Sequence, residues 1–268
     1  MGRPNLIGRA AIAALAAVAV VLGAWLLPRA FEPPTSGAPT KGAPDASGAS
    51  GTGPGAFDYE PPEPGTYDLP AIERAADGRV LDETGRPIRL RSLFDGRVTV
   101  LSFIYTRCAD ATACPMATGV LRDLHDATRR DPDLAKRVRL ITFSFDAEHD
   151  TPTVMARYAE AARGRGGDGG AEWLFLTAAT PGEVKPTLER YGQLVSRKPD
   201  PNDPLGPFYH LLRVFLIDRT GTVRNIYSTG FLDSRLVLAD VRTLLLEDEG
   251  RGADARGNGA RRRPTDGP

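Results

Sequence analysis

Residues 97–116 read RVTVLSFIYTRCADATACPM, in which an apolar run leads directly into the two cysteines of the chain. The run at 97–105 is short and rich in β-branched and aromatic residues, which is typical of a strand covered on both faces. Pro115 suits the first position of a helix, so Cys114 is expected at or near the N-cap of that helix. The partial positive charge of a helix N-terminus favours a thiolate. The stretch therefore predicts a reactive cysteine loop between a buried strand and a helix.

Strand and helix patterns alternate along the chain after this stretch. Strand-like apolar runs recur at 137–146, 173–178 and 211–218, and helical patterns cover 115–130, 151–162, 180–195 and 233–247. Residues 218–228 are expected to form a hairpin, because Gly221 can take the positive φ that a tight turn requires. The alternation predicts an α/β fold with a mixed sheet flanked by helices.

The N-terminus carries a long apolar segment. Residues 10–27 hold no charge, and a helix of that length spans roughly the 30 Å hydrocarbon core of a bilayer. Arg3 and Arg9 precede the segment, so the positive-inside rule leaves the N-terminus in the cytoplasm. A cleaved signal peptide is the alternative, although the apolar run is longer than usual and no clean A-x-A follows it. Both interpretations place the cysteines outside the cytoplasm.

Composition divides the chain into four parts. We expect a membrane anchor or signal at 1–28, a flexible Pro/Gly-rich linker at 29–65, a folded domain at 66–249 and a disordered tail at 250–268. The 34 basic and 34 acidic side chains balance, which gives no electrostatic reason to expect nucleic acid as a partner. Three histidines and two cysteines are too few for a conventional four-ligand zinc site.

The residues alone leave four interpretations of the cysteine pair. A structural disulfide would close a short loop and so gain little, and two unrelated buried thiols are a poor fit to one polar loop. A redox-active dithiol is the third interpretation. A Cu(I) site is the fourth, because two thiolates and one imidazole suit a soft ion of low coordination number. Spacing does not choose between redox chemistry and copper.

Three motifs together resemble the SCO/SenC family of membrane-anchored, thioredoxin-like proteins that assist copper-centre assembly in cytochrome c oxidase. The motifs are LSFIYTRCADATACP, LITFSFDAEHDTP and YHLLRVFLIDRTG, in the family's order and spacing. The resemblance implies a thioredoxin-like fold with extra N-terminal strands, and a copper site made by Cys108, Cys114 and His210. It implies delivery of copper to the binuclear site of oxidase subunit II, and a supporting role for Asp146. Better-known members space their cysteines C-x3-C with a proline after each, whereas this chain has C-x5-C and Ala109.

Other residues near these motifs have expected roles of their own. His125 is expected at the surface or the boundary of its helix, and His149 in a solvated turn, where it could still be a fourth donor. Met116 is in helical phase with apolar neighbours and is expected to pack in the core. Tyr105 and Phe208 are expected to wall the site against water.

The sequence therefore predicts a copper-binding assembly factor rather than an enzyme, with Cys108, Cys114 and His210 as copper ligands that pass the ion on by ligand exchange. Its expected place is a bacterial-type inner membrane, with a single span and the globular domain on the periplasmic or extracytoplasmic side. The expected partner is cytochrome c oxidase subunit II or another copper-dependent respiratory protein. The alternative is a membrane-tethered thiol-disulfide oxidoreductase, with Cys108 and Cys114 as the catalytic pair and no role in copper transfer.

Overall fold

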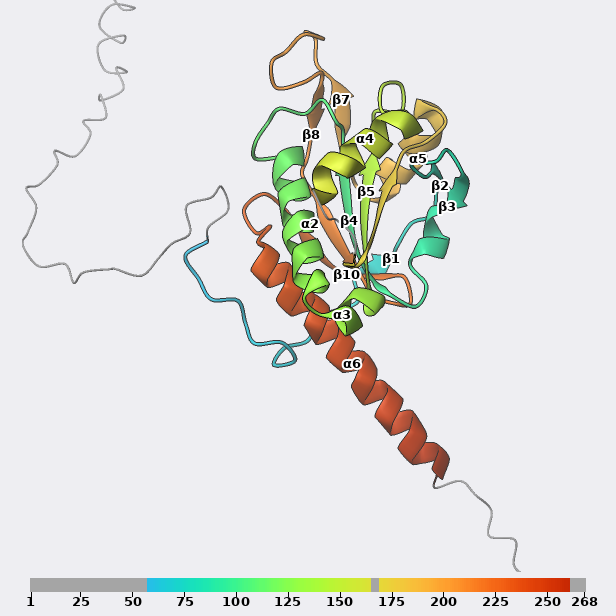
Figure 1. Ribbon diagram of the computed structural model, residues 1–268, viewed down its shortest axis with the longest axis vertical. Coiled ribbons are helices and arrows are strands. Elements are labelled where there is room, and N and C mark those ends of the chain that lie inside the picture. The colour runs from blue at the N-terminus through green and yellow to red at the C-terminus, as the bar shows by residue number, and fades with distance from the viewer. Residues whose placement is uncertain (1–56, 165–168, 261–268) are drawn as a thin grey trace, which may run out of the picture. The chain divides into compact units, whose positions relative to one another are not determined.

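The computed structural model describes residues 57–164 and 169–260 (Figure 1). The expected anchor and most of the expected linker lie outside these residues. Within the described part of the chain, no helix combines enough length with enough apolar character to cross a membrane.

A six-stranded mixed sheet forms the centre of the domain, with the order β1-β10-β9-β4-β5-β6. Its strands are β1 (Glu73–Arg74), β4 (Val98–Ile104), β5 (Val138–Ser144), β6 (Glu172–Leu176), β9 (Val214–Ile217) and β10 (Thr222–Tyr227). Strands β4, β5 and β6 run parallel, and β9 pairs antiparallel with β4. Strands β9 and β10 form the predicted hairpin, with Gly221 at φ +77° in its turn. The prediction of a mixed sheet is confirmed.

The central strands are apolar because helices or short elements cover both faces of the sheet. Every residue of β4 and β9 is buried. On one face, Trp173 and Phe175 of β6 contact His125 and Tyr158, which belong to two helices. Phe103 of β4 is in register with Leu176, the neighbour of Phe175 on β6. Side chains alternate along a strand, so Phe103 points to the opposite face, where it packs against other aromatic rings. This two-sided burial is what the unbroken apolar runs predicted.

The helices follow the strands in the expected order. They are α2 (Cys114–Arg129), α3 (Pro132–Arg137), α4 (Pro152–Arg163), α5 (Pro181–Arg190) and α6 (Ser234–Ala260). The Thr151 side chain caps α4 by accepting from the Val154 backbone N–H. Helix α2 packs against α4 and α6 on one side of the sheet, and α5 packs against the short strand β2 (Arg79–Leu81) (Figure 1).

Several short elements escape the sequence patterns. They are β1, the hairpin of β2 and β3 (Pro87–Arg89), the 3-10 helix η1 (Leu90–Leu93), α3, and the separate two-stranded sheet of β7 (Val195–Arg197) and β8 (Phe208–His210). Strands of two or three residues are too short to show a period of their own. The early strands agree with the N-terminal strands that the family resemblance implied.

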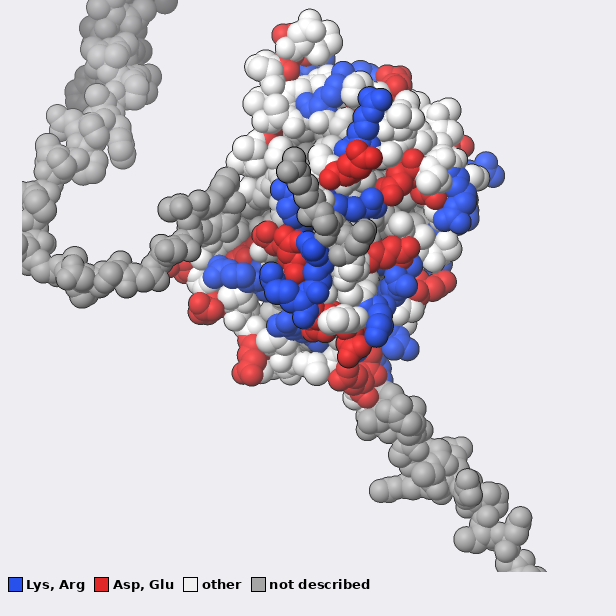
Figure 2. Space-filling model, in the orientation of Figure 1, with Lys and Arg blue, Asp and Glu red and all other residues white. Residues whose placement is uncertain are grey.

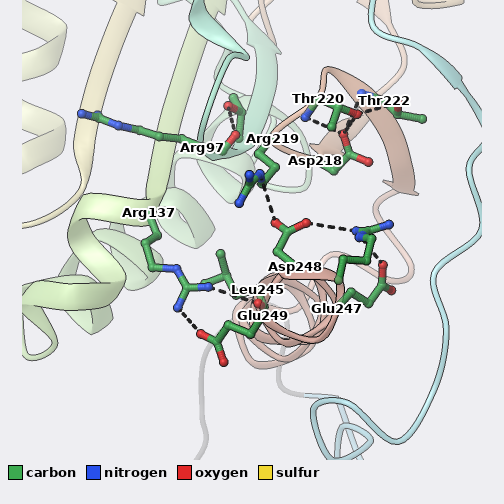
Figure 3. A network of polar contacts seen from close by, with 12 residues as sticks. Arg97, Arg137, Asp218, Arg219, Thr220, Thr222, Leu245, Glu247, Asp248 and Glu249 are labelled. Carbon is green, nitrogen blue, oxygen red and sulfur yellow. Dashed lines mark hydrogen bonds and ion pairs between the residues drawn. The ribbon is translucent and has the colours of Figure 1, made fainter. Parts of the chain in front are cut away.

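Helix α6 is held to the sheet by charged side chains and is longer than predicted. Arg224 of β10 pairs with Asp218 at 3.3 Å and with Glu247 at 3.0 Å. Arg137 pairs with Glu249 at 2.6 Å, beside the same turn of the helix (Figure 3). The helix continues to Ala260, although the sequence predicted a disordered tail from residue 250. Residues 250–260 contain no proline, and their Ala and Arg residues favour a helix, whereas the four glycines of the same stretch oppose it and gave it the composition of a tail.

Candidate metal centre

The cysteines lie at the carboxyl edge of β4, as the sequence predicted. Strand β4 ends at Ile104, a loop follows, and α2 begins at Cys114 with Pro115 in its first turn. Cys108 lies within the loop, which places its backbone outside the regular ladder of the sheet. Both thiols are free and both side chains are buried. Two thiols therefore face the same small volume, one held by a helix and the other by a loop.

His210 reaches this volume from the far end of the sequence. It is the last residue of β8 and pairs with Val195 of β7. In Figure 1 this hairpin lies beside the loop that joins β4 to α2. The connection between β7 and β8 contacts the cysteine loop, because the Leu205 carbonyl accepts from the Tyr105 hydroxyl and from the Ala109 backbone N–H. These bonds hold the small sheet, and His210 with it, close to the cysteine loop.

The three side chains converge on one another. The His210 Nε2 atom lies 3.3 Å from the Cys114 Sγ atom and 3.9 Å from the Cys108 Sγ atom. All three donor atoms lie within 4.8 Å of one another. Two sulfur atoms and one imidazole nitrogen at such separations can bind a single soft ion with small adjustments, and thiolate donors select soft ions.

The two thiols differ in acidity, in the opposite sense to the prediction for Cys114. Hydrogen bonding from Cys114, supported by His210, lowers the pKa of Cys108 to about 4. Burial raises the pKa of Cys114, and the neighbouring Cys108 sulfur raises it further. The prediction that the helix terminus would make Cys114 the thiolate is therefore wrong. Removal from water is the main influence on Cys114, and Cys108, which Cys114 hydrogen-bonds, is the more acidic thiol of the pair.

Aromatic rings wall the site, as predicted for Tyr105 and Phe208. The ring of His210 lies 5.3 Å from Tyr105 and 5.6 Å from Phe145, centroid to centroid. Phe208 packs edge-on against Tyr105 at 5.2 Å. Burial raises the pKa of Tyr105, and the charge on Cys108 adds to the effect, so the phenol stays protonated. The rings keep water from one side of the donor atoms.

The site opens to the outside along two directions. A groove of about 310 Å³ reaches Cys108 between α2 and α4, lined by residues that include Thr106, Pro115 and Tyr158. On the hairpin side, Tyr209 and Leu211 flank His210 and are 59% and 45% exposed. The two cysteines are thus buried and His210 is half-buried, so the donors lie just beneath the surface. Figure 2 shows basic and acidic side chains interspersed over one face of the domain, in keeping with the balanced composition.

A second group of potential ligands lies in the turn after β5. Asp146, His149 and Asp150 place three donor atoms within 4.8 Å of one another. Arg107 pairs with the Asp146 carboxylate at 2.6 Å, which gives Asp146 a defined structural contact near the site. His149 is exposed to solvent, as predicted, with 42% of its side chain accessible, and its Nδ1 donates to Asp150 at 2.8 Å. Each carboxylate already accepts from side chains, so we assign no metal to this turn.

Two further expectations concern α2. His125 is 3% exposed and packs against Trp173, so the prediction of a surface or boundary position is wrong. Strand β6 covers this end of the helix, and neither helical phase nor polarity revealed it. Met116 is partly buried against the core, as expected.

Comparison with known proteins agrees with this geometry. The SCO1/SenC family model matches residues 75–246. A SCO1 protein homolog of Bacillus subtilis is 28% identical over 147 residues, which cover 55% of this chain and 69% of the relative. The solution structure of apo Sco1 from Thermus thermophilus is 26% identical, with a TM-score of 0.52 over 67% of this chain and 95% of the other. Copper-bound ScoI of Arabidopsis thaliana shares the fold, with a TM-score of 0.53 at 17% identity over 65% and 98% of the two chains. On the extent of the family match, this chain belongs to the SCO1/SenC family.

Proposed function

We propose that the protein is a copper-binding assembly factor that carries copper at Cys108, Cys114 and His210 and passes it to a respiratory copper protein. The observation that carries this proposal is the convergence of two sulfur atoms and one imidazole nitrogen within 4.8 Å. The copper-bound structures of similar proteins, which share this fold, support the choice of metal.

The donor set suits copper as a cargo. Thiolate and imidazole ligands stabilise Cu(I), and the same set can hold Cu(II). The Cys108 sulfur is already a thiolate at neutral pH, because its pKa is lowered to about 4. Only Cys114 then has to release a proton when the metal binds, and its buried thiolate gains a metal as counter-charge.

Transfer by ligand exchange requires a partner to bring its own donors to the site. Five of the exposed large apolar side chains lie on segments next to the site: Leu194, Leu205, Tyr209, Leu211 and Phe231. Leu194 precedes the partner strand of His210, and the Leu205 carbonyl accepts from Tyr105 and from the Ala109 backbone. Exposed apolar residues gathered around a site are typical of surfaces that bind proteins. These five residues, the apolar rim of the site, therefore support transfer of copper to another protein.

The proposed recipient is the binuclear copper site of cytochrome c oxidase subunit II. The family resemblance supports this recipient, and the uncharged segment at 10–27 supports a tether in the same membrane. We place the domain on the periplasmic or extracytoplasmic side of a bacterial-type inner membrane. Tethering raises the effective concentration of the domain near a membrane-embedded partner.

Thiol-disulfide exchange is the second candidate function, and the acidity of Cys108 favours it. The Cys108 thiolate would attack one sulfur of a partner disulfide, and the other partner sulfur would leave as a thiolate. Cys114 would then lose its proton to that thiolate and displace the first partner sulfur. The chain would end as a Cys108–Cys114 disulfide and the partner as a dithiol, with two electrons transferred. Such a reaction has no need of His210 as a ligand.

Replacement of His210 by alanine separates the two functions. In the reduced full-length protein, we expect His210→Ala to weaken Cu(I) binding at least tenfold and to abolish the thiolate-to-Cu(II) absorption band. Reduction of a model disulfide should continue, because both thiols remain. Copper affinity equal to that of the wild-type chain would refute the proposed ligand set and leave the dithiol function.

A further inference from the structure

The cysteine loop is fixed by the acidic turn that follows β5. Thr106 and Arg107, the two residues immediately before Cys108, both hydrogen-bond to this turn. The Thr106 backbone N–H donates to Asp150 Oδ2 at 2.9 Å, and the Thr106 hydroxyl donates to Asp150 Oδ1. Arg107 donates to Asp146 Oδ2 at 2.6 Å.

Asp150 is fully buried, with 0% of its surface exposed. It accepts from four groups: the backbone and hydroxyl of Thr106, the hydroxyl of Ser144 at the end of β5, and the imidazole of His149. A buried carboxylate is tolerated only when its acceptor sites are filled, and here they are filled by two strand ends at once. Asp150 thus ties the exit of β4 to the exit of β5.

Cys108 depends on this tie more than the other two donors do. Cys114 is fixed by the first turn of α2, and His210 by the ladder between β7 and β8. Cys108 lies in a loop, and its own backbone N–H donates to the Tyr105 carbonyl at 3.2 Å. On its far side the loop is held by long hydrogen bonds, from the Ala109 N–H to the Leu205 carbonyl at 3.3 Å and from the Thr229 hydroxyl to the Thr112 carbonyl at 3.4 Å. The Cys108 sulfur is also the donor farther from His210. A shift at Thr106 is therefore transmitted directly to the metal-binding sulfur.

We propose that Asp150 is a positioning residue that holds Cys108 in place for metal binding by clamping Thr106. This proposal rests on the proposed copper function for its metal readout only. Asp150 touches no donor atom, so it acts on the site through the loop. Groups that orient metal ligands from behind commonly contribute 10- to 100-fold in metal affinity.

Two variants test the clamp. Asp150→Asn keeps the shape, but a single carbonyl oxygen and an amide NH₂ cannot accept from all four donors. Thr106→Val removes only the hydroxyl, and Thr106→Ser restores it. In the full-length protein we expect Asp150→Asn to lower Cu(I) affinity roughly 10- to 100-fold and Thr106→Val to lower it less. Thr106→Ser should bind as the wild-type chain does.

Asp218 offers a matched control at the opposite end of the sheet. It is also buried and accepts from the backbone and hydroxyl of Thr220 and from the Thr222 backbone. Asp218→Asn should lower the stability of the domain without changing copper affinity or the Cu(II) spectrum. An equal loss of affinity in Asp150→Asn and Asp218→Asn would show a general loss of stability and overturn the proposal.

A readout without metal keeps this inference separate from the copper function. In the metal-free reduced protein, mass spectrometry can measure the alkylation rates of Cys108 and Cys114. We expect Asp150→Asn and Thr106→Val to change the ratio of the two rates at least severalfold. An unchanged ratio in both variants, with wild-type copper affinity, would overturn the positioning role even if copper binding is established. If the wild-type chain binds no copper, the proposed function fails, and the alkylation ratio still decides the role of Asp150.

Discussion

The acidity of Cys108 predicts an unusual pH profile for its reaction with iodoacetamide. An ordinary cysteine has a pKa of about 8.5, so only about 0.3% of it is thiolate at pH 6. With a pKa of about 4, about 99% of Cys108 is thiolate at that pH. The thiolate of such an acidic thiol is also a weaker nucleophile, by about two powers of ten for a shift of this size.

These two effects set the expected magnitude. At pH 6, Cys108 should react within about threefold of an ordinary cysteine, and at pH 9 about 100-fold more slowly. Its rate should be nearly constant from pH 5.5 to 9, while that of a reference cysteine rises about 800-fold. Restricted access through the groove beside α2 lowers the rate equally at every pH and leaves the profile unchanged. Cys114 should react much more slowly than Cys108, since it is 1% exposed and its pKa is raised.

The assay is alkylation of the reduced, metal-free protein across this pH range, with peptide mapping to separate the two sites. The same chain unfolded in urea supplies the reference cysteine. The Cys114→Ala variant removes the main hydrogen-bond donor to Cys108, so the plateau should begin at a higher pH. His210→Ala should shift it in the same direction by less. A Cys108 rate that rises tenfold per pH unit up to pH 8, or alkylation of Cys114 first, would refute the assigned acidities.

Three other predictions follow from named contacts. Burial lowers the pKa of His125, so the stability that the neutral imidazole contributes is full above the unfolded-state pKa of about 6.5 and is lost as the pH falls below it. In urea unfolding between pH 7 and 5, His125→Phe should reduce the slope of the unfolding free energy against pH by up to about 1.4 kcal/mol per pH unit. Gly206→Ala should lower the free energy of unfolding by about 1–3 kcal/mol and weaken copper binding, because Gly206 has φ +102° and an added Cβ would clash with Tyr105 Oη. Thermal unfolding and metal titration would check the two effects, and wild-type values in both would contradict the close packing. Tyr209→Glu and Leu211→Glu should slow copper transfer to a soluble subunit II domain while copper affinity stays unchanged, and unaltered transfer kinetics would exclude the apolar rim as the contact surface.

The sequence predicted the central fold well because its strands are buried on both faces. The runs at 97–105 and 137–146 became β4 and β5, nearly to the residue. The short strands β7 and β8 were not predicted, since three residues carry too little pattern. The approach of His210 to the cysteines was therefore an implication of the family resemblance alone.

The sequence predicted which residues make up the site more completely than it predicted their acidity. Spacing relative to α2 favoured Cys114 as the thiolate, but the acidity of a thiol depends on burial and on hydrogen bonds across the fold. His125 was misjudged for a similar reason, because the strand that covers it lies far along the chain. The role of Asp150 was missed, although two acids four residues apart in SFDAEHDTP could have suggested a turn that binds backbone amides.

The pairing of β7 with β8 has a consequence for how the family can vary. Because this hairpin forms its own two-stranded sheet, changes in its length or sequence leave the hydrogen bonds of the central sheet intact. The central sheet and the hairpin that carries His210 can then vary separately, so relatives with the same central sheet can differ in their affinity for a bound ion and in the rate at which they release it.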